Sequence, residues 1–438
     1  MASIMNLPYK HDEVFQGEVA ARIPYHRMYG KQYCLPSLTV LESHESQAIA
    51  EAAYWVDRIY WKVLRFVQRY MPDTFLIEQL GLHPALIDSA RIEVPFHGVS
   101  RQDWILHEHG LKCIENNTDT PTGIPETAYL AEALVEGYTD YCTASKDMRN
   151  HIQQAFRHLI DYYQQQGLDG GIAFTCYDSH LEDLTNTMYL LHAVEELGYP
   201  AFFVPLDQLE IIPGEGLYVE GKQISILYRL YPLEYLVHDR DEIHDRPVGE
   251  DLLELIMNGK LGIMNPPQSM ITQSKGFMAL IWSLYEHYEE TTRLCGFELF
   301  EEKELQRIPL YFLPTYFDPS VFQLSHIPYV EKSYWGREGK GTAIFGGDGI
   351  LELSEWGAEQ EEQADIRDYY TNQPKIYQQH HPMTELELIT EEGPYTGSLL
   401  LGAYVIGGQY AGLLPRIGGK ITGDMAYYCP AAVEKPLP

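Results

Sequence analysis

The sequence has few basic residues for its size. Among 438 residues, Lys and Arg number 31 and Asp and Glu number 63, so the formal net charge is −32. Such a chain repels phosphate backbones and anionic bilayers, and binding to nucleic acid or to a membrane surface is therefore not expected. The acidity can attract a substrate that is cationic or bound to magnesium. The alternative is that it serves only solubility.

Long hydrophobic runs are also absent. No stretch approaches the roughly 18 apolar residues that a membrane-crossing helix needs, and the most apolar one, GSLLLGAYVIGG (397–408), is typical of a buried strand. The N-terminal residues MASIMNLPYK lack the charged-then-apolar pattern of a signal peptide. The six cysteines are scattered without a CxxC pair, which is typical of a reducing cytoplasm rather than of a disulfide framework.

Several motifs of familiar catalytic sites are missing as well. The chain has no GxxxxGK[ST] phosphate loop, no HExxH and no GxSxG nucleophile elbow. HEH (107–109) and HHP (380–382) lack metal-ligand spacing with a third partner nearby. These histidines are therefore expected to be structural or surface residues.

The patterns that are present predict a mixed α and β chain of two or three packed units. Two short apolar runs, 171–177 and 201–205, flank a predicted helix, which indicates a βαβ unit with a small parallel sheet. Glycine-separated strands dominate the C-terminal half, and the acidic stretch 352–368 between them is expected to be a solvated loop or helix. Apolar residues at helical spacing predict helices over 45–71, 147–166, 180–197 and 273–290.

The most informative stretch is VSRQDWILHEHGLKCIENNTDTP (99–121), which predicts a β-hairpin with Gly110 supplying a positive φ. With a loop over 108–110, the predicted pairs are His107–Leu111, Ile105–Cys113, Asp103–Glu115 and Arg101–Asn117. One face of the hairpin then carries Arg101, Asp103, Glu115, Asn117 and, two residues further on, Asp119. A two-residue loop instead places Asp103 and Glu115 on opposite faces.

Three carboxylates on one face of a hairpin repel each other unless positive charge neutralises them. Hard oxygen ligands of this kind suit Mg²⁺, and the arginine suits a phosphate or an anionic intermediate. The alternative is a solvated polar face held together by ion pairs.

Two lysines and a glycine-rich hairpin form a second set. NPPQSMITQSKGFMALIW (265–282) opens a helix near Lys275, and YVEKSYWGREGKGTAIF (329–345) places Lys332 at the end of a strand and Arg337 in the following turn. Backbone N–H groups of such a turn can approach phosphates, which lysines neutralise; the alternative is an ordinary turn. In the block 397–423, two apolar strands lead to Arg416. This arginine is expected either to contact a phosphoryl group or to form an ion pair at the surface.

In combination, these blocks resemble the glutathionylspermidine synthase family in its ATP-grasp ligase domain, over residues 95–430. The family order is an R-x-D strand, an E-x-N-x-D-(T/S) strand, a buried acidic helix start, an N-P…S-K-x-x-x-x-x-(L/I)-W helix, a V-x-K…G-R-x-G hairpin and a G-x-Y-x-x-G-G-x-x-x-G…R…I-T end. Two positions depart from the family pattern. Ser333 replaces a proline, and Leu230 replaces a polar residue before the turn 231–234, which affects the expected peptide pocket.

The resemblance implies an α+β ATP-grasp fold with permuted chain order, a small βαβ pre-ATP-grasp-like region and N-terminal helices. The expected units are a helical region (1–95) that packs on the ligase, a metal- and substrate-binding α/β region (96–215) and a nucleotide-binding ATP-grasp region (216–438). Residues 1–95 lack the Cys/His pair of a thiol-dependent amidase, which is similar to the stand-alone ligases of the family.

The resemblance also implies a role for each candidate site residue. The expected Mg²⁺ ligands are Asp103, Glu115 and Asn117. The expected ATP-binding residues are Lys275, Lys332, Gly339 and Gln378. Arg101 is expected to contact the transferring phosphate, and Arg337 to act from a mobile loop. The expected substrate residues are Thr120 and Thr122 for a peptide, Glu182 and Asp183 for a polyamine ammonium, and Arg416 for the peptide or a phosphate. The alternative for the acidic pair is a helix N-terminus, which also favours acidic residues.

The implied reaction is ATP-dependent amide formation through an acyl phosphate, with ATP and Mg²⁺ as cofactors. It would join a small carboxylate, such as the peptide glutathione, to an amine such as spermidine in the cytoplasm. Two alternatives stay open: a metal-dependent phosphohydrolase that uses the same carboxylates, and a non-catalytic polyamine- or nucleotide-binding protein.

Overall fold

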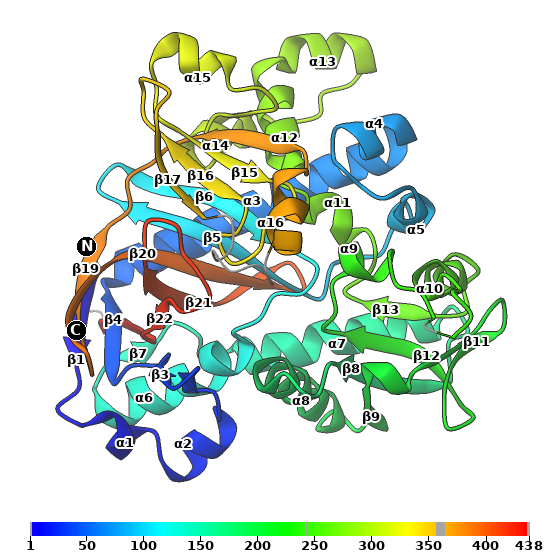
Figure 1. Cartoon of the computed structure of the whole chain (residues 1–438), viewed down its shortest axis with the longest axis horizontal. Coiled ribbons are helices and arrows are strands. Elements are labelled where there is room, and N and C mark those ends of the chain that lie inside the picture. Colours follow the sequence, from blue (N-terminus) through cyan, green and yellow to red (C-terminus); the bar gives the residue numbers. More distant parts are fainter. Residues whose placement is uncertain (1, 242, 356–363, 436–438) are drawn as a thin grey trace.

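A central antiparallel sheet joins strands from the first third and the last eighth of the chain (Figure 1). The computed structural model describes residues 2–241, 243–355 and 364–435. Strands run in the order β22-β21-β20-β5-β6, with β19 paired to β20. Their bounds are Val99–His107 (β5), Gly110–Asn117 (β6), Glu385–Thr390 (β19), Gly393–Ile406 (β20), Gln409–Gly418 (β21) and Tyr427–Tyr428 (β22).

A second antiparallel sheet carries the glycine-rich hairpin and lies above the central sheet in Figure 1. Its order is β14-β18-β15-β16-β17. The bounds are Thr315–Tyr316 (β14), Tyr329–Ser333 (β15), Thr342–Phe345 (β16), Leu351–Glu355 (β17) and Lys375–Gln379 (β18).

The predicted βαβ unit is confirmed, because β8 and β9 are parallel and α8 connects them. The sheet has the order β10-β11-β12-β8-β9, and β13 pairs with β12 in parallel. Its strands are Gly171–Cys176 (β8), Ala201–Pro205 (β9), Glu210–Ile212 (β10), Gly216–Val219 (β11), Lys222–Arg229 (β12) and Gly262–Met264 (β13).

The N-terminal region contains strands as well as the predicted helices. A four-stranded sheet, β1-β4-β23-β7, joins Ser3–Asn6, Ser37–Leu41, Ala431–Val433 and Cys142–Thr143, and a short ribbon pairs β2 (Arg27–Met28) with β3 (Lys31–Gln32). Sequence reasoning missed β4 because one of its partners, β23, comes from the other end of the chain, and it missed β1, which pairs with β4.

The longest helix, α3 (Ser43–Tyr70), follows the predicted segment 45–71 closely. A capping box of Glu42 and Glu45 opens it, and its apolar stripe, which includes Val56 and Val63, is fully buried. The helix packs against β20 and β21 and so covers one face of the central sheet.

Other predicted helices are present with small shifts. The segment 147–166 forms α7 (Met148–Gln164) and 180–197 forms α8 (Leu181–Glu195). The predicted helix 273–290 is instead two helices, α12 (Gly276–Glu286) and α13 (Tyr288–Cys295), because the chain leaves helical geometry at His287. The acidic stretch 352–368 lies mostly outside the described residues.

The remaining α-helices of the described residues are α1 (His11–Val14), α2 (Gly17–Arg22), α4 (Asp73–Glu78), α5 (Ile87–Ala90), α6 (Ala131–Tyr138), α9 (Leu233–Leu236), α10 (Val248–Met257), α11 (Ser269–Gln273), α14 (Glu302–Tyr311), α15 (Ser320–Ser325) and α16 (Ala364–Thr371).

The architecture is α+β, as predicted. Three of the sheets contain strands from both 96–215 and 216–438, so the boundary expected between these two units does not separate sheets. The units themselves stay a prediction. Within the described residues, no helix has the length and apolarity that a bilayer span requires.

Candidate active site

One cavity of about 810 Å³ collects the site residues predicted from the sequence. Its lining comes from strands of the central and second antiparallel sheets, from the helices α8, α9 and α16, and from connecting segments. All the predicted residues line it: Arg101, Asp103, Glu115, Asn117, Thr120, Thr122, Glu182, Asp183, Lys275, Lys332, Arg337, Gly339, Gln378 and Arg416. The tertiary fold therefore brings together residues more than 300 positions apart in the sequence.

The β5–β6 hairpin places its carboxylates as predicted. Asp103 lies opposite Glu115, and Arg101 lies opposite Asn117, which confirms both predicted pairs. The shared face follows from this register, since residues directly opposite each other in a ladder point to the same side.

The predicted hairpin loop is nevertheless wrong. His107 pairs with Gly110, which leaves a two-residue loop, so the other two predicted pairs, 107–111 and 105–113, are wrong as well. The ladder shifts by one residue because β6 contains a β-bulge at Ile114. The bulge compensates for the shorter loop and returns Glu115 to the face that carries Asp103.

Asp103 is held by positive charge on two sides. It accepts hydrogen bonds from Arg101 Nε at 3.0 Å and from an Arg416 terminal nitrogen at 2.8 Å. Burial disfavours ionisation, but these two guanidinium groups outweigh it and keep the pKa of the Asp103 carboxyl below its usual range. Gly402, opposite Asp103, makes room for this pair: a Cβ there would lie 2.7 Å from Cδ of Arg101.

Asp119 was expected on the same face, and this expectation is wrong. β6 ends at Asn117, and Asp119 is buried in an ion pair with Arg229. Asp119 Oδ2 also accepts the backbone N–H of Leu233 at 3.1 Å. This carboxylate therefore supports the wall of the βαβ region rather than the cavity.

Each predicted ATP-binding lysine contacts the β5–β6 hairpin. Lys275 Nζ donates to Glu115 Oε1 at 2.8 Å and to the Gly336 carbonyl at 2.7 Å. Lys332 Nζ donates to Gln378 Oε1 at 2.8 Å and to the carbonyl of the bulged Ile114 at 3.0 Å. Burial lowers the pKa of Lys332 to about 8.

Arg337 lies in the connection between β15 and β16 and bridges two other segments. Its Nε donates to Glu234 Oε1 at 2.7 Å, and another nitrogen donates to Thr120 Oγ1 at 3.2 Å. Glu234 lines a second cavity of about 440 Å³, so the ion pair links the walls of two cavities. Sequence reasoning noted the turn containing Glu234 but missed this pairing.

The glycine-rich connection lies close to the end of β21. A Cβ on Gly339, which has a φ of +77°, would lie 2.7 Å from Ile421 Cγ2 and 2.9 Å from the Thr422 carbonyl. Glycine is therefore required at this position both by the backbone conformation and by the neighbouring segment.

An acidic part of the cavity lies at the start of α8. Glu182 and Asp183 fall in the first turn of the helix, whose N-cap is His180. Burial, together with the neighbouring carboxylates Glu126 and Asp183, raises the pKa of Glu182 to about 8. Burial also raises the pKa of Asp183. A cationic ligand would stabilise the ionised forms of these half-buried carboxyls.

The cavity also contains residues that sequence reasoning missed. They include Tyr33, Tyr177, Tyr235, Glu338, Lys340, Lys420 and Asp424. Lys340 and Lys420 lie within the quoted glycine-rich blocks, which is the signal that could have identified them. The tyrosines come from segments without a distinguishing pattern.

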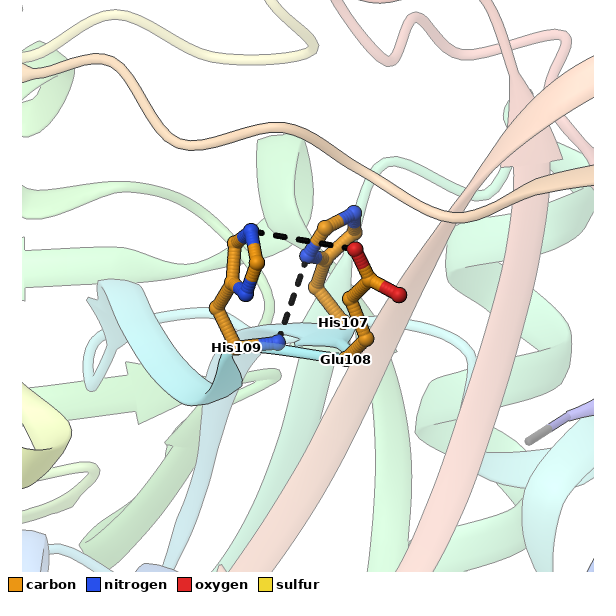
Figure 2. Close-up of side chains that lie close together, drawn as sticks. All are labelled: His107, Glu108 and His109. Carbon is orange, nitrogen blue, oxygen red and sulfur yellow. Dashed lines mark hydrogen bonds and ion pairs between the residues drawn. The ribbon is translucent and has the colours of Figure 1, made fainter.

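The HEH motif is at the tip of the β5–β6 hairpin, where Figure 2 shows the three side chains on one side of the turn. His107 is half-buried, and Glu108 and His109 are exposed. The expectation of surface residues holds for the latter two, yet the three side chains offer ligand atoms within 4.8 Å of one another.

Comparisons with known proteins agree with this geometry. The family model of the glutathionylspermidine synthase preATP-grasp domain matches residues 17–434. A Haemophilus influenzae protein described as "Putative acid--amine ligase" is 23% identical over 75% of this chain and 73% of its own length. The bifunctional glutathionylspermidine synthetase/amidase of Escherichia coli is 19% identical over 62% of this chain, which spans 44% of that protein.

A solved structure shares the fold. The apo form of a glutathione synthetase-like effector from Globodera pallida has a TM-score of 0.52 at 11% identity, over 90% of this chain and 89% of that one. At this identity the likeness concerns the fold alone. With the family match over almost the whole chain, the predicted ATP-grasp class is confirmed, and the chain belongs to the glutathionylspermidine synthase family.

Proposed function

We propose that this protein is an ATP-dependent ligase that joins a small carboxylate to an amine through an acyl phosphate. The observation that carries the proposal is one cavity in which the hairpin carboxylates Asp103 and Glu115 meet three arginines and several lysines, Lys275 and Lys332 among them. A phosphoryl transfer needs such a set, since negative charge must be neutralised at both the transferring group and the leaving nucleotide. The family membership and the acid–amine ligase name of a relative support the same reaction.

The donor set fits the magnesium that such a reaction requires. Asp103, Glu115 and Asn117 supply two carboxylates and an amide from adjacent strands, and oxygen ligands of this kind suit Mg²⁺. Bound there, the ion would neutralise phosphate oxygens and polarise the γ-phosphoryl group. In the structure, Arg416 forms an ion pair with Asp103 and Lys275 forms one with Glu115, so these two cations neutralise the carboxylates.

The chain's own residues would divide the remaining work. Lys275 and Lys332 would bind the nucleotide phosphates. A carboxylate oxygen of the substrate attacks the γ-phosphorus, the bond to the β-phosphate oxygen breaks, and ADP leaves. Arg101, near the hairpin carboxylates, would stabilise the charge on the transferred phosphoryl group and on the tetrahedral intermediate.

The amine would then complete the reaction. Glu182 and Asp183 would hold its ammonium form. After one of these carboxylates takes a proton from it, the nitrogen attacks the acyl carbon, the bond from that carbon to the phosphate oxygen breaks, and inorganic phosphate leaves. Closure of the connection that carries Arg337 would exclude water, which otherwise hydrolyses the acyl phosphate. A peptide carboxylate near Thr120 and Thr122 and a polyamine are the substrates we propose, in the cytoplasm where ATP is supplied.

A substrate panel tests this proposal. Purified protein with ATP and Mg²⁺ is incubated with small peptides, including glutathione, crossed with polyamines and amino acids, while ADP and product mass are measured. ADP release that requires both a carboxylate and an amine, with an amide of the expected mass, supports the ligase. ADP or phosphate release that is independent of an amine would indicate a phosphohydrolase, and nucleotide binding without turnover would indicate a binding protein.

A further inference from the structure

The tip of the β5–β6 hairpin carries a group of metal-ligating side chains outside the active cavity. His107, Glu108 and His109 each offer one ligand atom, and all three atoms lie within 4.8 Å of one another (Figure 2). Metal bonds to nitrogen and oxygen of roughly 2.0–2.2 Å bring ligand atoms within about 4.4 Å of each other. Small rotations of the exposed Glu108 and His109 side chains toward the half-buried His107 would therefore be enough to enclose an ion.

The present contacts of these side chains are weak ones. His109 Nε2 lies 3.8 Å from Glu108 Oε1, and the backbone N–H of His109 donates to His107 Nδ1 at a long 3.4 Å. Because the donor is a backbone N–H, the His107 Nδ1 atom must carry a lone pair, as a metal ligand does. An ion would thus replace weak interactions rather than strong ones.

A fourth group lies beside the hairpin tip. The ring centroids of His381 and His107 are 5.7 Å apart. His381 Nδ1 is 3.0 Å from the Pro382 carbonyl, which can only accept, so Nδ1 carries the proton and Nε2 keeps its lone pair. Metal-bound histidines usually have this arrangement, with the second ring nitrogen donating to a carbonyl.

We propose that His107, Glu108 and His109, with His381 as a fourth ligand, bind one divalent cation of the Zn²⁺ class. Imidazole nitrogens favour Zn²⁺ and its transition-metal neighbours, whereas Mg²⁺ prefers oxygen ligands such as those around Asp103. The two cation sites would therefore differ in both position and metal.

The ion would fasten two segments that border the active cavity. The hairpin carries Asp103 and Glu115 in its strands, and His381 lies in the connection that follows Gln378 of β18. This connection already contacts the hairpin, since Thr384 Oγ1 donates to the Leu106 carbonyl at 2.7 Å. A metal bridge would add a second link between the same two segments.

The test is a Zn²⁺ titration of chelator-treated protein against a chromophoric competitor, in the presence of millimolar Mg²⁺. Wild type should bind one Zn²⁺, and the H107A/H109A double variant should bind it about tenfold or more weakly. His44→Ala is the matched control, because exposed His44 also lies 3.2 Å from a carboxylate, that of Glu42, yet belongs to no such group among the described residues. His381→Ala should lose less affinity than the double variant.

Thermal unfolding gives an independent readout that needs no activity. Zn²⁺ should raise the Tm of wild type and of His44→Ala but not that of the double variant, since a ligand stabilises only the state that binds it. Equal Zn²⁺ affinity in wild type and double variant would overturn the proposal, as would equal losses in His44→Ala. Displacement of Zn²⁺ by Mg²⁺ would also overturn it, because the ion would then occupy the oxygen site.

Discussion

Asp103 and Glu115 share a face of the β5–β6 hairpin because Ile114 is an extra residue between two regular parts of the ladder. The bulge has a second effect, since the Ile114 carbonyl accepts a hydrogen bond from Lys332 Nζ. One backbone irregularity thus aligns two carboxylates and anchors a lysine from the second sheet. Bulges are often found where a side chain must be re-aimed next to a functional site.

Asp103→Asn should reduce ADP release by about 100-fold or more, the size of effect seen when one group that stabilises transition-state charge is removed. The substitution keeps the shape of the side chain but removes the charge that Arg101 and Arg416 share. The measurement is initial ADP production with saturating ATP and Mg²⁺.

Asp140→Asn is a suitable control for that experiment, because Asp140 is exposed and does not line the cavity. It should leave ADP production unchanged. Wild-type turnover in a folded Asp103→Asn protein, verified by its thermal unfolding, would remove the hairpin carboxylate from the mechanism.

The hairpin also shows what sequence reasoning could and could not supply. Polar residues at period two indicated that Asp103 and Glu115 share a face, but the loop length was wrong, and a bulge leaves no mark that a pairing count detects. The register was therefore correct only because two deviations cancel. Asp119 was misplaced for a related reason: strand periodicity was extended past Asn117, where β6 ends.

Motif order was a better guide than periodicity. It identified Lys275, Lys332 and Arg416, which the structure places on the same cavity although they lie in three different segments. Motif order did not predict contacts between distant parts of the chain. The strand β1 pairs with β4, which lies next to the C-terminal β23, and Glu234 contacts Arg337 about 100 residues away. Neither contact has a local signal in the sequence.

Nucleotide binding should weaken as the pH rises through about 8. Burial lowers the pKa of Lys332 to about 8 from an ordinary value of 10.5, so the free protein loses this positive charge above that pH. Phosphates favour the protonated form, so ADP binding at pH 8 should take up about half a proton. Calorimetry in buffers of different ionisation enthalpy measures this uptake.

Lys332→Met is the informative variant for this pH effect. It should bind ADP more weakly at pH 7 and show a flatter pH dependence between 7 and 9. If the wild-type affinity does not change across this range, Lys332 is not the titrating group at the nucleotide.

Glu182→Gln should raise the KM of the amine by about tenfold or more, equivalent to about 1.4 kcal/mol of lost binding free energy. The KM values of ATP and of the carboxylate substrate should change little, because Glu182 lies at the acidic part of the cavity. The amine KM of wild type should also fall between pH 6.5 and 8.5, as Glu182 becomes ionised. An unchanged amine KM together with a raised KM for the carboxylate would assign Glu182 to the other substrate.

The same carboxyl gives a stability prediction with a definite sign. The pKa of Glu182 is about 8 in the folded protein and 4.5 in a model compound, so the folded state binds the extra proton between these values. Its contribution to stability is present below pH 4.5 and is lost as the pH rises through 8. The Tm of Glu182→Gln relative to wild type should therefore increase from pH 5 to pH 8, and a constant difference would contradict the raised pKa.

Arg337→Ala should uncouple ATP consumption from amide formation. Arg337 fastens the glycine-rich connection to Glu234 and Thr120, and this connection also packs against the segment after β21 at Gly339. Without that anchor, water should reach the acyl phosphate before the amine does.

We expect the ratio of ADP to amide product to rise from one in wild type to well above one in the Arg337→Ala variant, because ADP production should fall less than amide production. Arg337→Lys, which keeps the charge but not the two-pronged contact, should lie between them. If ADP and product fall together in Arg337→Ala, the arginine acts on the phosphoryl transfer itself, because a loss of that step removes both products in equal proportion.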